Sequence, residues 1–197
     1  MNIQSTDIKQ YDKRSQIIES AIDLFVAKGF QHASMALLSK ESGIAIGTIY
    51  HYFKSKDELI EDTYFYVIQK YGNAIRFTMS ESRLGLRERF NLIWSKSYNF
   101  YIDRPNYYFL KDSLNYSPLI SKELMDESRK YYQVVFDLIK EGIENKIFSE
   151  GNPVAMCMWL YNSLLTPVQL KLGGEMEMTD EELLSFIDMS WKGITKH

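Results

Sequence analysis

Residues 34–59 read SMALLSKESGIAIGTIYHYFKSKDEL, and they say more about the architecture of this chain than any other stretch. Ser34 is a suitable N-cap for a short helix that stops at Gly43, and a second helix is predicted from Ile46 to Phe53. Two short helices around a glycine have the spacing of a helix-turn-helix, whose second helix enters the major groove of DNA. The stretch therefore indicates DNA binding, although a compact helical hairpin without that role has the same spacing.

The second helix and the turn after it carry side chains suited to DNA. Small residues let the start of the helix approach DNA closely, and three aromatic residues offer polar groups on its exposed face. Two lysines stand next to the N-terminus of the following helix, where unpaired N–H groups and the helix dipole favour a phosphate. These residues are Gly47, Thr48, Tyr50, His51, Tyr52, Lys54 and Lys56. The apolar contacts expected to fix the angle between the two helices come from Leu38, Ile44, Ile49 and Phe53.

Apolar residues recur at intervals of three and four on both sides of this stretch, which is the period of helices rather than strands. An N-terminal helix is predicted to end at Gly29. The S-x-x-E capping box at Ser55 opens a long helix that reaches about Ser80. Another helix is predicted over about 86–102.

Prolines mark the starts of the later helices. Pro105, Pro118 and Pro153 each suit a first helical turn, and Pro167 lies inside a helix that it should kink. Thr179 opens a second capping box. The helices after Pro105 are predicted over about 118–146, 153–172 and 179–192.

The predicted fold class is therefore all-α, with about nine helices. An N-terminal three-helix domain with the helix-turn-helix occupies residues 1–55. A C-terminal helical bundle occupies residues 56–197.

Composition and charge agree with a globular protein. The 197 residues are 45% hydrophobic and 14% aromatic, which does not suit disorder. Residues 1–56 carry seven basic and five acidic side chains, against 16 and 21 in residues 57–197, so a weak hint of nucleic-acid binding lies at one end only. With one cysteine, no apolar leader and no membrane-length apolar run, the chain is expected in the cytoplasm.

The segment GTIYHYFKSKDEL, preceded by a first helix ending in FVAKGF, closely resembles the tetracycline-repressor (TetR) family of transcriptional regulators. In that family a similar pattern closes the recognition helix and opens the next helix. The resemblance covers residues 15–59. The residues that match the pattern are Gly47, Thr48, Ile49, Tyr50, Tyr52, Phe53, Lys56 and Leu59.

The resemblance implies roles for single residues on the DNA side. Ser34 would cap the first short helix and contact a phosphate, and Lys56 would hold another. Thr48 and Tyr52 would reach backbone oxygens or nearby bases. The resemblance favours a Tyr50 that packs inside with its hydroxyl near the backbone. His51 would be exposed, against a phosphate or a base.

The chain departs from the family pattern at three places. Ala45 stands where a serine or threonine often caps the recognition helix, and Ile46 stands where a polar residue often touches bases. Ala36 and Leu37 are apolar where polar contacts are common. We therefore expect fewer hydrogen bonds to bases, although Ile46 can touch a thymine methyl group.

The C-terminal part resembles the dimerisation and ligand-binding domain of the family, in which the last two long helices of each subunit form a four-helix interface. An intrachain core is the alternative for the apolar residues of these helices. The residues predicted for the interface are Trp159, Leu160, Leu164, Leu183, Phe186, Ile187 and Trp191.

Aromatic residues crowd residues 94–109, and an apolar cavity with a few phenolic hydroxyls suits a hydrophobic or amphipathic ligand. Ordinary core packing is the alternative. The residues predicted to line this cavity are Trp94, Tyr98, Tyr101, Phe109, Met125, Tyr132 and Met158.

No catalytic motif is found. None of the three histidines sits at metal-ligand spacing, and phosphate-binding and nucleophile motifs are missing from the sequence. We therefore predict a DNA-binding regulator without cofactor or metal, a homodimer on a pseudo-palindromic operator, with repression relieved by a small hydrophobic ligand. A non-catalytic helical adaptor is the alternative, followed by an all-helical enzyme.

Overall fold

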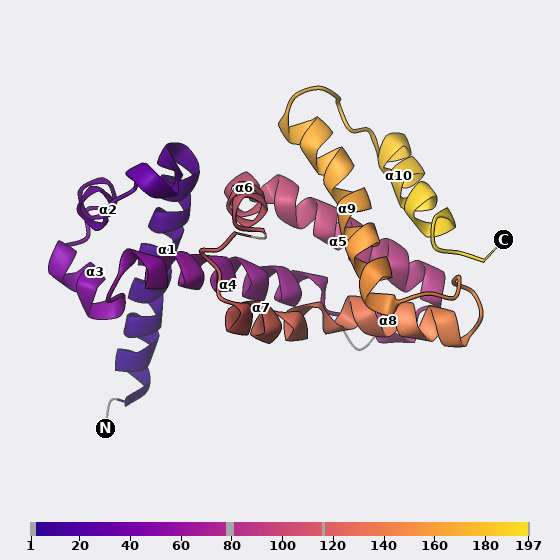
Figure 1. Cartoon of the computed structure of the whole chain (residues 1–197), viewed down its shortest axis with the longest axis horizontal. Helices are drawn as coiled ribbons and strands as arrows, with labels where there is room; N and C mark the ends of the chain where they lie inside the picture. The colour runs from indigo at the N-terminus through magenta and orange to yellow at the C-terminus, as the bar shows by residue number, and fades with distance from the viewer. Residues whose placement is uncertain (1–2, 78–80, 116, 197) are drawn as a thin grey trace. The chain divides into compact units, whose positions relative to one another are not determined.

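The computed structural model describes residues 3–77, 81–115 and 117–196 (Figure 1). Within these ranges the chain forms ten α-helices and two short 3₁₀ helices, together with one isolated antiparallel bridge between Phe148 and Thr195. The predicted all-α class is confirmed. Contacts divide the chain into two compact units, one of Met1–Ile68 with Asn106–Ser128 and the other of Gln69–Pro105 with Arg129–His197.

The first unit holds the predicted helix-turn-helix. Its elements are α1 (Ile3–His32), α2 (Met35–Ser42), α3 (Ile46–Tyr52), the start of α4 (Lys56–Ile75), most of α6 (Pro105–Leu114) and α7 (Lys122–Ser128). The hydroxyl of Ser34 accepts a hydrogen bond from the Leu37 N–H at 3.1 Å, and Gly43 ends α2 in the left-handed conformation with φ 67°. Both ends of α2 are as predicted.

Two helix ends differ from the prediction. Gly29 breaks the helical backbone of α1 with φ 75° and ψ 156°, but helical residues resume and reach His32. The long helix α4 ends at Ile75 rather than near Ser80, which lies outside the described residues. At its other end the Ser55 hydroxyl accepts from the Glu58 N–H at 3.1 Å, as a capping residue does.

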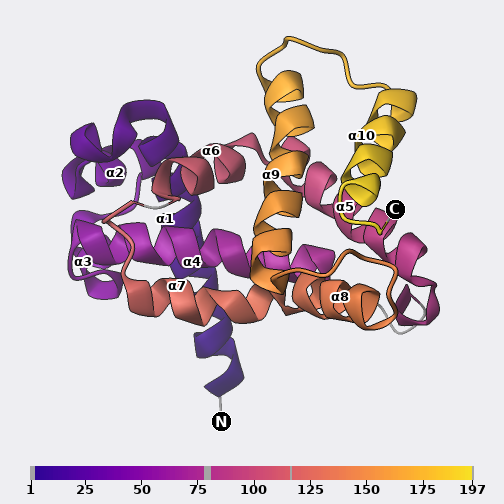
Figure 2. The same ribbon diagram turned by 45° about the vertical axis from the view of Figure 1, so that its right-hand side comes forward.

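The second unit is a bundle around α9. Its elements are the end of α4, η1 (Glu81–Arg83), α5 (Leu86–Asp103), η2 (Arg129–Tyr132), α8 (Gln133–Glu144), α9 (Pro153–Leu172) and α10 (Asp180–Lys192). Helix α9 contacts α5, α8 and α10, and Figure 2 shows α9 and α10 side by side. The predicted caps are confirmed: the Asn152 side chain accepts from the first N–H groups of α9, and Thr179 forms a capping box with Glu182.

The helix predicted from Pro118 to Lys146 is wrong. Pro118 lies in a turn closed by a bond from the Ile120 N–H to the Ser117 carbonyl at 3.2 Å. The next helix starts only at Lys122, after Ser121, and the segment up to Glu144 divides into α7, η2 and α8. Proline fits a turn as well as a first helical turn, so its presence alone did not distinguish the two.

Polar groups inside the second unit are paired with one another. The Trp94 Nε1–H donates to the Ser190 hydroxyl at 3.2 Å, and this hydroxyl also lies 2.9 Å from the Ser163 hydroxyl. The hydroxyls of Tyr71 and Ser97 are 2.9 Å apart, and burial raises the pKa of Tyr71 to about 12. Because buried polar groups are costly unless bonded, these pairs favour one packing of α5, α9 and α10.

Candidate DNA-binding surface

Helix α3 is anchored through one apolar face. Ile49 and Phe53 are fully buried, and Leu38 and Ile44 are buried beside them, as predicted. Ala45 precedes α3 and makes no side-chain capping bond, which fits the expected departure from the family pattern. The apolar contacts leave the opposite face of α3 directed outward.

That outward face carries four exposed residues, Ile46, Gly47, Tyr50 and His51. Ile46 is 44% exposed and Tyr50 is 46% exposed, so the expectation that Tyr50 packs inside is wrong. Tyr50 lies four residues after Ile46 and therefore shares its face, whereas the adjacent Ile49 takes the buried direction. Thr48 and Tyr52 are half-buried at the edges of this face.

The two lysines after α3 differ in their surroundings. Lys54 is exposed, and its ammonium lies 3.3 Å from the His51 carbonyl. Lys56 is half-buried, and its ammonium donates to the Phe30 carbonyl at 2.5 Å. Lys56 therefore links the start of α4 to the end of α1.

Arg14 on α1 braces the helix-turn-helix, and the sequence analysis did not find it. Its guanidinium lies 2.6 Å from the Asp62 carboxylate and 5.2 Å from the centre of the Phe53 ring. Burial raises the pKa of Asp62 above its ordinary value, and the neighbouring Arg14 acts against that rise. No local sequence pattern identifies these partners, because Arg14 lies on α1, Phe53 directly follows α3 and Asp62 lies on α4.

A carboxylate on α1 connects this helix to two others. Glu19 accepts a hydrogen bond from the Tyr66 hydroxyl of α4 at 2.8 Å and from the Tyr107 hydroxyl of α6 at 2.5 Å. Asn106 donates to Asp23 at 2.7 Å. These bonds explain why residues 106–128 group with the N-terminal helices.

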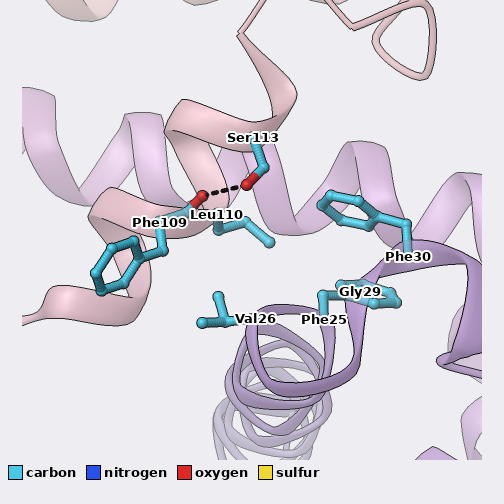
Figure 3. Close-up of a pocket in the computed structure, with 7 residues that line it drawn as sticks. All are labelled: Phe25, Val26, Gly29, Phe30, Phe109, Leu110 and Ser113. Atoms are coloured by element: carbon cyan, nitrogen blue, oxygen red, sulfur yellow. Dashed lines mark hydrogen bonds between the residues drawn. The ribbon is translucent and has the colours of Figure 1, made fainter.

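The same two helices, α1 and α6, border an apolar groove of about 490 Å³ (Figure 3). Its one hydroxyl, that of Ser113, donates to the Phe109 carbonyl within α6 at 2.8 Å. The lining residues are Phe25, Val26, Gly29, Phe30, Phe109, Leu110 and Ser113. The groove thus includes Phe109 from the predicted ligand set, and its wall suits an apolar occupant.

The other predicted ligand residues are divided between the units. In the second unit the stacked pair Trp94 and Tyr98 lies on α5, and Tyr101 and Tyr132 each have ring centres 5.6 Å from that of Tyr71. Met158 also belongs to the second unit, but its side chain is exposed, and Met125 belongs to the first unit. Tyr71, which joins two of these rings, was missed because it lies far from them in the sequence.

The predicted interface residues fall into three groups. Leu160, Leu164 and Ile187 are buried within the second unit, whereas Trp159 is exposed. Leu183, Phe186 and Trp191 are half-buried. The structure adds further exposed apolar side chains on α9 and α10, namely Val154, Met158, Leu184 and Met189.

The described residues form neither a candidate metal site nor a membrane-crossing helix. None of their His, Cys, Asp and Glu side chains form a group of three or more that could hold a metal ion. No helix within these ranges is long and apolar enough to cross a membrane.

Comparison with known proteins agrees with this geometry. Residues 17–63 match the family model described as bacterial regulatory proteins, tetR family. A helix-turn-helix transcriptional regulator of Haemophilus influenzae is 25% identical over 194 residues, which are 94% of this chain and 97% of that protein. The fatty acid metabolism regulator protein of Bacillus subtilis is 25% identical over 146 residues, 73% of this chain and 75% of its own length.

The fold has close counterparts among solved structures. A TetR family transcription regulator from Marinobacter aquaeolei superimposes with a TM-score of 0.86 at 21% identity, covering 96% of this chain and all of that one. A buried anchoring face, an outward recognition helix and this fold define a helix-turn-helix regulator that binds DNA. The chain is a DNA-binding transcriptional regulator, and its helix-turn-helix segment, residues 17–63, matches the tetR family.

Proposed function

We propose that this regulator is a repressor that binds a pseudo-palindromic operator as a homodimer and leaves it when an apolar or amphipathic small molecule binds. Residues 1–55 would supply the DNA-binding domain, and residues 56–197 the ligand-binding and dimerisation domain. The outward face of α3 carries the proposal, since buried Ile49 holds the helix from the other side. The proposed DNA contacts are Ser34, Ile46, Gly47, Thr48, Tyr50, His51, Tyr52, Lys54 and Lys56.

Contacts to phosphate and contacts to bases would come from different residues. Ser34 is exposed at the N-cap of α2, and Lys54 is exposed after α3, so both can meet the DNA backbone. Lys56 retains N–H donors besides the one that reaches the Phe30 carbonyl. Base contacts would come from the outward face of α3.

A homodimer is supported by the apolar side chains that α9 and α10 leave exposed. Val154 and Met158, four residues apart, share one face of α9, Trp159 is also exposed on this helix, and Leu184 and Met189 lie on α10. Exposed apolar patches of this kind mark interaction sites. A two-fold dimer would also place two recognition helices on successive turns of DNA, about 34–36 Å apart.

An apolar ligand is supported by two observations. Five of the seven residues that line the groove between α1 and α6 have apolar side chains, and the B. subtilis relative is named a fatty acid metabolism regulator. We therefore choose laurate and palmitate as the first probes.

Binding of the full chain to labelled genomic fragments tests the proposal, followed by titration of the complex with each fatty acid. A ligand that prefers the DNA-free form, with a typical coupling of about 1–3 kcal/mol, weakens operator binding by roughly 5- to 150-fold. The absence of any sequence-specific complex would exclude the repressor. A specific complex that no apolar ligand weakens would exclude only the release mechanism.

The place of binding can be tested separately. The three tryptophans, Trp94, Trp159 and Trp191, all belong to the second unit, so ligand-dependent tryptophan fluorescence reports on that unit. The substitution Ser113→Leu adds bulk to the groove of the first unit. Ligand binding that survives Ser113→Leu and quenches tryptophan supports a site in the second unit. Binding lost in this variant supports the groove.

A further inference from the structure

The recognition helix lacks the side chains that usually read bases by paired hydrogen bonds. Guanine is read by Arg or Lys, adenine by Asn or Gln, and cytosine by Asp or Glu. None of these residue types occurs in Ile46–Tyr52, whose sequence is IGTIYHY. Paired hydrogen bonds from such side chains therefore cannot supply most of the discrimination between base pairs along α3.

The same helix exposes an apolar and an aromatic side chain side by side. Ile46 in the first turn and Tyr50 four residues later are each almost half exposed on the outward face. The C5 methyl of thymine is the apolar group that base pairs present in the major groove, and apolar side chains contact it. Burying Ile46 against any other base edge would desolvate a polar group without a partner.

Residues beside the outward face of α3 offer few polar groups that could contact bases. Ala36 is exposed and Leu37 is half-buried, and both are apolar. The hydroxyl of Ser34 accepts a bond from the Leu37 N–H. Among the exposed residues of α3, His51 is the one with ring nitrogens, and it lies a full turn beyond Gly47.

We propose that Ile46 and Tyr50 recognise thymine methyl groups, so that each operator half-site carries thymines beneath the first turns of α3. The proposal rests on the DNA surface proposed above and names the sequence class which that surface selects. Ile46 would determine specificity at one base pair, and the ring of Tyr50 at an adjacent one.

The test uses the full chain and DNA that it selects from a random duplex library. Each thymine of the selected half-site is then replaced by deoxyuridine, which removes the methyl group and keeps the Watson–Crick edge. The dissociation constant is measured by fluorescence anisotropy at one fixed salt concentration. We expect about fourfold weaker binding for one contacted thymine and about 16-fold for the same thymine in both half-sites, the factors that burial of one methyl-sized group gives.

A variant assigns the contact to its residue. Ile46→Ala should weaken binding to the thymine duplex, and replacement of the contacted thymine by deoxyuridine should then cost it almost nothing more. Ile147→Ala is the matched control, because Ile147 is 39% exposed in the second unit. The control should keep the full fourfold sensitivity to deoxyuridine.

The possible outcomes separate the two proposals. Deoxyuridine sensitivity in the unmodified chain, lost in Ile46→Ala, supports the inference. Selected half-sites without methyl-sensitive thymines overturn it. An Ile46→Ala variant whose binding weakens by the same factor on the thymine duplex and on the deoxyuridine duplex also overturns it. Selection of no DNA sequence at all overturns the proposed function itself.

Discussion

Gly29 and Gly47 show that the backbone conformation of a glycine decides whether a side chain can be added there without strain. Gly29 has φ 75° and ψ 156°, a region that essentially only glycine adopts. Gly47 lies inside α3, and no neighbouring group lies within 4 Å of the place that a Cβ would take. The same added methyl group is therefore strained at one position and unstrained at the other.

Alanine substitutions at these glycines should change stability in opposite directions. We expect Gly29→Ala to lower the free energy of unfolding by roughly 1–3 kcal/mol, the cost of a disfavoured backbone region. Gly47→Ala should raise it by roughly 0.5–1 kcal/mol, because alanine favours helix over glycine. Urea denaturation followed by circular dichroism measures both. Equal signs for the two variants would contradict this explanation.

Lys111 on α6 is a buried lysine whose titration should affect stability. Burial lowers the pKa of its ammonium from 10.5 to about 7. Between these values the unfolded chain binds more protons than the folded chain, so the free energy of unfolding should rise with pH above about 7. Lys111→Met should reduce this rise.

Denaturation at about pH 7 and about pH 8.5 measures the effect, within the range where the two states of Lys111 differ in bound protons. The exposed Lys122 provides the matched control, since Lys122→Met removes a lysine that already lies in water. The Lys122 variant should keep the pH dependence of the unmodified chain. An unchanged slope in Lys111→Met would show that Lys111 does not titrate in this range.

At the scale of elements, the start of α4 contributes to packing within the first unit and, in the proposed function, to DNA binding. Its Ser55 cap and the ammonium of Lys56 hold it against the preceding turn and the end of α1. The same ammonium is proposed to contact a phosphate. Under this proposal, DNA binding and the packing of α1 depend on one side chain.

Lys56→Ala should weaken binding to all DNA sequences similarly and lower the slope of log affinity against log salt by about one unit. Lys54→Ala should lower the slope similarly. Of the two, Lys56→Ala should also lower thermal stability, because it removes the bond to the Phe30 carbonyl. Salt titrations and melting curves of both variants measure this. An unchanged slope with lost sequence discrimination in Lys56→Ala would argue for a base contact instead.

At the scale of the whole molecule, the exposed apolar side chains of α9 and α10 are the proposed dimer interface. Leu184 is 62% exposed, and Met189 lies five residues later on the same helix. Glutamate at both positions would place charges in the proposed dimer interface, where they would lose water without gaining a partner.

We therefore expect the unmodified chain to sediment as a dimer at micromolar concentration and the Leu184→Glu, Met189→Glu variant as a monomer. Leu119→Glu is the matched control, because Leu119 is also an exposed leucine but lies in the first unit. The monomeric variant should bind a palindromic operator far more weakly than the control. A monomeric unmodified chain would exclude the homodimer.

The sequence by itself determined the parts of this protein that depend on near neighbours. The caps at Ser34 and Thr179 and the left-handed end at Gly43 involve atoms within three or four residues, so local patterns predicted them. The helix-turn-helix and the family motif lie in one continuous segment, and they identified a DNA-binding regulator.

Only the tertiary structure decided what depends on residues far apart in the chain. The Tyr107 hydroxyl donates a hydrogen bond to the Glu19 carboxylate, 88 positions away in the sequence. Phe30 and Phe109 both line the groove between α1 and α6. The outward direction of Tyr50 follows from the packing of Ile49. Whether a side chain is buried depends on which distant helix packs against it. An apolar or aromatic residue therefore looks the same in the sequence whether it lies in a core, in a groove or on a DNA-binding face.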